Sequence, residues 1–217
     1  PIWLSTQQEL IKATDALLPG DFTDPIGQAD LLDSDVLEGN VRLFISSKIE
    51  VQSLTIEAYI QKVLPKFFNG GGQNDLSKYQ NLVTELAKHP SLIDDDESKK
   101  LLASLPLIPT LDGNWSTPEN TYRRTDDLVK VLGEATHLWL DSTRIPDSPA
   151  VTGFLNSLGI LKKPSPAHLV ERMRNIAENY NPPTEEAKKL SEEAFYKLCE
   201  LYKKEPLKLR SVGKKTI

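Results

Sequence analysis

Cysteine and histidine, the residues that most often build disulfides and metal centres, are scarce in this sequence. Its 217 residues include one cysteine, Cys199, and three histidines. A single cysteine excludes a disulfide within the chain and argues against a cysteine-based zinc site. The scarcity favours a reducing compartment, so we expect a cytoplasmic protein.

Long apolar runs and a surplus of positive charge are also lacking. No apolar run approaches the roughly 18 residues of a membrane span, and the first residues do not follow the basic-then-apolar pattern of a signal peptide. We therefore expect no membrane partner. The net charge of −5 argues against a chain whose main task is to coat nucleic acid. The hydrophobic content of 39% is enough for a packed core.

Recognisable catalytic and cofactor motifs are missing as well. The histidines are His89, His137 and His168, too far apart for metal-ligand spacing. The carboxylates of residues 94–97 are consecutive and lack the alternating spacing of a calcium loop. Residues 70–72 are three glycines without the lysine of a P-loop. We expect a protein that is not an enzyme and that holds no metal or cofactor.

The most informative stretch is residues 105–122, LPLIPTLDGNWSTPENTY. It consists of an apolar run, a turn at Asp112-Gly113-Asn114 and a second short strand. Asp-Gly supplies the positive φ that a two-residue hairpin turn requires, and the prolines fit only an edge or irregular strand. We predict a small hairpin with Asp112 in the turn and Trp115 in the core. The structural motif comprises Pro109, Thr110, Asp112, Gly113, Trp115, Pro118 and Tyr122.

A degenerate copy of this stretch lies at the start of the chain, where residues 2–17 align without a gap with residues 107–122. Similar matches continue downstream of both copies. The matched pairs include Ser5 with Thr110, Leu10 with Trp115, Ala13 with Pro118, Leu17 with Tyr122, Leu32 with Leu140, Phe44 with Phe154, and Thr55 with Ser165. Thr55 and Ser165 are each placed to cap a helix. These matches indicate an internal repeat.

A helix with one apolar stripe is predicted late in each copy. The stripe positions are Tyr79, Leu82, Val83 and Leu86 in the first copy and Phe195, Leu198, Cys199 and Tyr202 in the second, each set at i, i+3, i+4, i+7. We therefore predict a helix-rich α+β fold of two tandem units, residues 1–104 and 105–217, each a hairpin followed by about three amphipathic helices. Ile217 would begin a third hairpin, so we expect the chain to continue in a longer protein.

The stretch 105–122 resembles a recurring phrase of the sacsin-like family: an apolar run ending in Pro-Thr, then Asp-Gly, a large residue, a Pro and a Tyr. Residues 154–160, followed by Pro164 and Ser165, are similar to the family's short helix and capped helix. The first copy departs from the phrase, with Gln7 and Gln8 in place of Asp-Gly. In such proteins a GHKL-type ATP-binding module similar to that of the Hsp-ninety chaperones precedes regions of this kind.

The resemblance implies that this segment lies downstream of an ATPase module and does not bind nucleotide itself. We expect a non-catalytic scaffolding segment of a chaperone-like or defence-type protein, which relays nucleotide state to protein clients. Its partners would be the rest of its own longer chain, including the ATPase module, and those clients.

A basic stretch near the end of the chain supports an alternative function, a nucleic-acid-binding module. Its cationic residues are Lys203, Lys204, Lys208, Arg210, Lys214 and Lys215. The acidic remainder of the chain opposes this alternative. An enzyme in its own right is the third possibility, and it would need a pocket that brings distant His, Asp or Glu side chains together.

Overall fold

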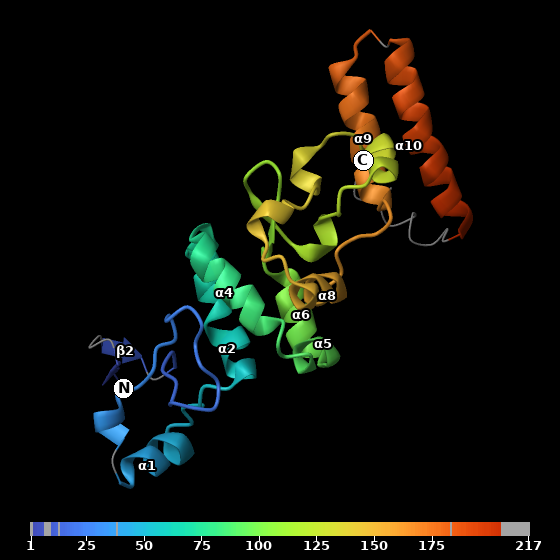
Figure 1. The fold of residues 1–217 in the computed structure, drawn as a ribbon. Helices are drawn as coiled ribbons and strands as arrows, with labels where there is room; N and C mark the ends of the chain where they lie inside the picture. Colours follow the sequence, from blue (N-terminus) through green and yellow to red (C-terminus); the bar gives the residue numbers. More distant parts are fainter. Residues whose placement is uncertain (1, 7–9, 13, 38, 183, 205–217) are drawn as a thin grey trace. The chain divides into compact units, whose positions relative to one another are not determined.

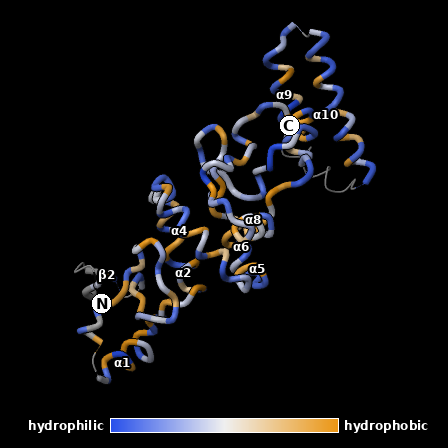
Figure 2. The backbone as a smooth tube through the Cα atoms, viewed as in Figure 1, coloured by the Kyte–Doolittle hydropathy of each residue, from blue (hydrophilic) through white to orange (hydrophobic). Residues whose placement is uncertain are grey.

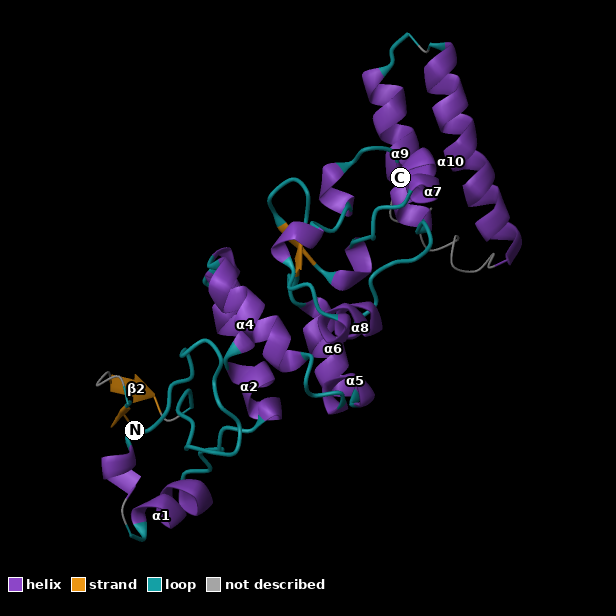
Figure 3. Cartoon of the chain, in the orientation of Figure 1, coloured by secondary structure: helices purple, strands orange, loops and turns teal. Residues whose placement is uncertain are grey.

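The structure, a computed structural model, describes residues 2–6, 10–12, 14–37, 39–182 and 184–204. The prediction of a helix-rich α+β fold is confirmed: helices dominate, and short strands form two-stranded antiparallel sheets in the described part of the chain (Figure 3). The chain separates into two compact units. Unit 1 comprises Pro1–Leu107 with Ser142–Gly159, and unit 2 comprises Ile108–Asp141 with Ile160–Ile217.

Unit 1 begins with a hairpin and continues through short helices (Figure 1). Its elements are β1 Ile2–Leu4, β2 Leu10–Lys12, the 3-10 helix η1 Ser34–Leu37, α1 Val41–Lys48, α2 Ile56–Lys62, α3 Leu64–Asn69, η2 Gly72–Asn74, α4 Leu76–Leu86, α5 Ser91–Asp94, α6 Asp96–Ser104, η5 Ser142–Arg144 and α8 Pro149–Ser157. Because α8 groups with unit 1, the compact units are not continuous in sequence. The sequence boundary between residues 104 and 105 stays a prediction.

The predicted N-terminal hairpin is present. β1 and β2 pair antiparallel with Trp3 opposite Ile11 and Leu4 opposite Leu10. The matched position Ala13 lies outside the described residues. A buried cluster of aliphatic side chains, which includes Ile11 of β2, forms one part of the core: Ile11, Ala16, Leu18, Leu32, Ile45 and Val51.

The capped helix of unit 1 also follows the prediction. The Thr55 hydroxyl accepts a hydrogen bond from the backbone N–H of Ala58 at 3.2 Å and begins α2. Proline at position 65 lies in the first turn of α3, where its missing N–H costs no helical bond. The chain therefore breaks between α2 and α3 at Val63, just before this proline.

The helix α4 carries the predicted buried stripe. Tyr79, Leu82, Val83 and Leu86 are all fully buried. The Tyr79 hydroxyl donates a hydrogen bond to the Leu107 carbonyl at 2.9 Å. This bond connects α4 to the segment that follows α6. α8 packs against α4 in this unit.

Unit 2 contains the second hairpin and the longest helices (Figure 1). Its elements are β3 Ile108–Pro109, β4 Trp115–Ser116, η3 Pro118–Asn120, α7 Asp126–Leu132, η4 Thr136–Leu138, α9 Pro166–Asn179 and α10 Glu185–Lys204. α9 and α10 form a helical hairpin, and α7 contacts both of them. The sequence did not predict α7, a helix of seven residues.

The turn of the second hairpin differs from the predicted one. Thr110 N–H donates to the Asn114 carbonyl at 3.0 Å, and Gly113 N–H donates to the Thr110 carbonyl at 2.9 Å, so the loop has three residues. Gly113 has φ +85°, whereas Asp112 does not have positive φ. The predicted two-residue turn is therefore wrong: it would need positive φ at two successive residues, and the longer loop needs it only at glycine.

The packed face of α10 also differs from the prediction. Ala187 and Ala194 are buried, and Leu198 and Leu201 pack against the core of unit 2. Of the predicted stripe, Phe195 and Tyr202 are instead 53% and 50% exposed, and Leu198 and Cys199 are partly buried. Ala187, Ala194, Leu198 and Leu201 share one side of α10 at helical spacing, and this side is rotated from the predicted stripe, which leaves Phe195 and Tyr202 exposed.

Backbone hydrogen bonds recur at matched positions in the two units. Thr6 N–H donates to Leu31 O in unit 1, and Leu111 N–H donates to Trp139 O in unit 2. Leu17 N–H donates to Asp30 O, as Tyr122 N–H donates to Leu138 O. Leu32 N–H donates to Leu17 O, as Leu140 N–H donates to Tyr122 O. Each of these bonds measures 2.8–3.0 Å.

Two glycines allow a matched test of the hairpin turn. Neither Gly113 nor Gly153, which lies in α8, has any atom within 4 Å of an added Cβ, so their backbone conformations alone decide the effect. We expect Gly113→Ala to lower the free energy of unfolding by about 1–2 kcal/mol because φ is positive. Gly153→Ala should raise it by about 0.5–1 kcal/mol because alanine favours the helix. Urea unfolding of both variants measures this; equal effects of the two would contradict the assigned turn.

Candidate functional site

Tyr122 is the most highly connected side chain of the predicted motif. It is fully buried, and its ring contacts Trp139 with centroids 6.0 Å apart. Its hydroxyl accepts a hydrogen bond from the backbone N–H of Ser165 at 2.8 Å and lies 2.8 Å from His168 Nδ1. Ser165 in turn caps α9, because its hydroxyl accepts from His168 N–H at 3.2 Å. One phenol thus fixes the start of α9.

His168 lies partly buried beside polar and charged side chains, among them Tyr122, His137 and Glu171. Burial lowers the pKa of His168, the nearby Glu171 opposes this lowering, and His137 adds to it. The Tyr122 hydroxyl and His168 Nδ1 share a hydrogen bond whose direction is set by the tautomer of the imidazole. His137 Nε2 lies 3.6 Å from Glu171 Oε1 on the half-exposed side. Among the described residues, no group of three or more His, Cys, Asp or Glu side chains could hold a metal ion.

The other motif residues hold the hairpin together. Asp112 Oδ1 accepts hydrogen bonds from the Thr110 hydroxyl at 2.6 Å and from Asn114 N–H at 3.2 Å, while Oδ2 accepts from Asn114 Nδ2 at 2.8 Å. The bonds from Thr110 and Asn114 lower the pKa of Asp112. Thr110 and Pro118 are buried, the latter at the start of η3. These contacts give the motif a structural role.

Trp115 and Trp139 differ in how far they are buried. Trp139 is fully buried next to Tyr122, as a core residue should be. Trp115 is only half-buried, so its predicted place in the core is wrong. β4 has two residues, belongs to a two-stranded sheet and is half-buried at both positions, so the strand does not bury the indole.

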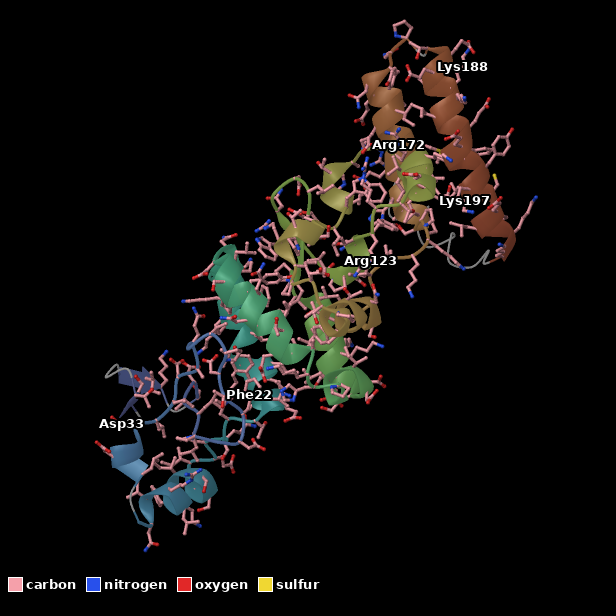
Figure 4. The ribbon with its side chains drawn as sticks, in the orientation of Figure 1. Phe22, Asp33, Arg123, Arg172, Lys188 and Lys197 are labelled. Carbon is pink, nitrogen blue, oxygen red and sulfur yellow. The ribbon has the colours of Figure 1, made fainter. Side chains whose placement is uncertain are left out.

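The basic stretch is only partly described. Lys203 and Lys204 are exposed at the end of α10, and Lys208, Arg210, Lys214 and Lys215 lie outside the described residues. Lys204 lines a groove of about 820 Å³ beside α7 and α10, together with Lys162, Lys163 and Lys197. Figure 4 labels Lys197 and Lys188 along α10. Asp127, Glu193 and Glu200 line the same groove, so it does not present one sign of charge.

Aromatic side chains form an exposed face on α10. Phe195, Tyr196 and Tyr202 are 53%, 66% and 50% exposed. Beside them is a nearly apolar hollow of about 310 Å³, lined by Leu198, Cys199, Tyr202 and Lys203. We call Phe195, Tyr196, Cys199 and Tyr202 the α10 face.

A second group of exposed apolar side chains lies on α1. Val41, Leu43 and Phe44 are 43%, 66% and 56% exposed, whereas Ile45 points into the core of unit 1. Hydrophobic residues recur along both α1 and α10 (Figure 2). We call Val41, Leu43 and Phe44 the α1 face. The sequence alone did not reveal these faces, because an apolar position next to buried ones is expected to be buried. Contiguous exposed apolar patches mark sites of interaction with proteins, membranes or ligands.

Comparisons with known proteins give no further identification. No family model, curated protein or solved structure matches the chain. Among the described residues, no helix is long and apolar enough to cross a membrane.

The Tyr122 hydroxyl provides a direct test of how α9 is held. Tyr122→Phe removes the acceptor of the part-buried Ser165 N–H and the partner of His168, so we expect the free energy of unfolding to fall by about 1–3 kcal/mol. Tyr196→Phe is the matched control, since Tyr196 is 66% exposed; its effect should stay within about 0.5 kcal/mol. Urea unfolding followed by circular dichroism measures both. Equal stability of the two variants would show that the hydroxyl does not hold α9.

Proposed function

We propose that this chain is a non-catalytic scaffolding segment built from two copies of one hairpin-plus-helices unit. The observation that carries the proposal is the recurrence of three backbone hydrogen bonds at matched positions. In each copy the chain after the hairpin forms backbone hydrogen bonds to a second extended segment. The central residue of these bonds is Leu17 in the first copy and Tyr122 in the second. The bridges between these segments also correspond, with Ser5 opposite Leu32 and Thr110 opposite Leu140.

Two further features support a role in binding proteins. The α1 and α10 faces expose large apolar side chains. Burying these side chains against a partner would be favourable in free energy. The polar cluster around Tyr122 is used internally, since the hydroxyl contacts the cap of α9 and the His168 ring. The buried polar groups of unit 2 thus support the fold, while its exposed apolar groups are available to partners.

The resemblance of residues 105–122 to the sacsin-like phrase suggests the wider context. In that context this segment belongs to a large cytoplasmic protein with a GHKL-type ATPase module, either chaperone-like or defence-type. The segment would connect that module to protein clients and relay its nucleotide state. Its own partners would be the ATPase module and those clients.

The proposal predicts that the folded chain does not bind nucleotide. We expect titration of the 217-residue chain with Mg-ATP in a calorimeter to give no binding heat, because the sequence has neither the lysine of a P-loop nor a counterpart of the GHKL-type ATP-site motifs. Micromolar affinity for ATP would contradict the non-catalytic assignment. A parallel titration with duplex DNA tests the nucleic-acid alternative, since phosphate contacts would give an affinity that falls steeply with salt.

A further inference from the structure

The α1 face has a buried counterpart elsewhere in the chain. α8 corresponds to α1 in the sequence repeat, with Phe154 matched to Phe44. In α8 the matched residues Val151 and Phe154 are only 1% and 6% exposed, whereas in α1 Val41 and Phe44 are 43% and 56% exposed. The same two positions are therefore buried in α8 and exposed in α1.

The cover of α8 includes the helix α4. α8 packs against α4 within unit 1, and the apolar stripe of α4 is completely buried there. α10 is the helix of unit 2 that corresponds to α4. Its matched positions Phe195 and Tyr202 belong to the exposed α10 face, while its other side packs on α9 and α7. Among the described residues, the α1-type helix α1 and the α4-type helix α10 thus each lack the kind of partner that α8 and α4 find in each other.

We propose that the α1 face of one copy of this chain docks on the α10 face of a second copy, head to tail. This inference rests on the repeat in the proposed function, because the pairing of α8 with α4 serves as its template. The occupant of each face is then a second copy of the same chain. The contact joins two different surfaces, so it does not close on itself and can extend to further copies.

The two faces match in length. α1 has eight residues, and the α10 face spans residues 195–202, so both extend about 12 Å along their helices. The hollow of about 310 Å³ beside Tyr202 can receive the Phe44 ring, since a cavity of about 150 Å³ is enough to hold benzene. Exposed residues of opposite charge lie beside the two faces: Arg42 and Lys48 on α1, and Glu192 on α10, one turn before Phe195.

The contact should be weak. Six exposed large side chains, at roughly 100 Å² each, would bury about 600 Å², which is less than the ~1,200 Å² of stable interfaces. Association should therefore depend on protein concentration and appear as a gradual rise in mass.

Sedimentation equilibrium of the full chain and of two variants tests the proposal. The weight-average mass of the unchanged chain should rise with concentration above the 24.3 kDa of one copy. Phe44→Asp and Phe195→Asp should each weaken association at least about tenfold, because each places a charge in one face. An equimolar mixture of the two variants should form a 1:1 dimer, because one variant keeps its α10 face and the other its α1 face.

Leu111→Asp is the matched control, since Leu111 is 46% exposed on the hairpin loop; it should associate like the unchanged chain. Three results would overturn the proposal: an unchanged chain that stays at the mass of one copy, a mixture that does not dimerise, or association lost in only one of the two face variants. The last would indicate a face that binds itself. None of these results bears on the absence of nucleotide binding, so the failure of the docking contact and of the proposed function remain distinguishable.

Discussion

The pairing of the Tyr122 backbone with the segment around Trp139 is the interaction on which unit 2 depends. Tyr122 N–H donates to Leu138 O at 2.8 Å, and Leu140 N–H donates to Tyr122 O at 2.9 Å. Tyr122 also forms a bridge with Leu161, on the segment that leads into α9. One residue therefore aligns three extended segments, and its hydroxyl positions the cap of the helix that follows. The hairpin itself is too short to be stable alone.

Unit 1 uses the same scheme with different side chains. Leu17 takes the backbone position of Tyr122, and its carbonyl accepts from Leu32 N–H at 2.9 Å. Leucine has no hydroxyl, so Leu17 cannot contact the cap of α2 as the Tyr122 hydroxyl contacts the cap of α9. The side-chain cap of α2 is Thr55. The backbone bonds recur although the side chains differ, which suggests that the pairing defines the unit and that the polar contacts of Tyr122 are an addition in unit 2.

Patterns local in sequence predicted much of this fold, and non-local contacts explain the rest. Helix caps at Thr55 and Ser165 and the stripe of α4 depend on residues a few positions apart, so the sequence predicted them correctly. The buried side of α10 depends on which neighbours it meets: Ala194 faces the core of unit 2, and Phe195, the next residue around the helix, is exposed. The exposed α1 and α10 faces were not predictable, because periodicity shows that a face is apolar and not whether anything covers it.

Amide hydrogen exchange measured by NMR tests most directly whether the two halves are copies of one unit. The amides of Leu17 and Leu32 in unit 1, and of Tyr122 and Leu140 in unit 2, donate the matched hydrogen bonds. If both units are built on this pairing, all four amides should be among the slowest to exchange in their own unit. Slow exchange at Tyr122 and Leu140 with rapid exchange at Leu17 and Leu32 would contradict the repeat.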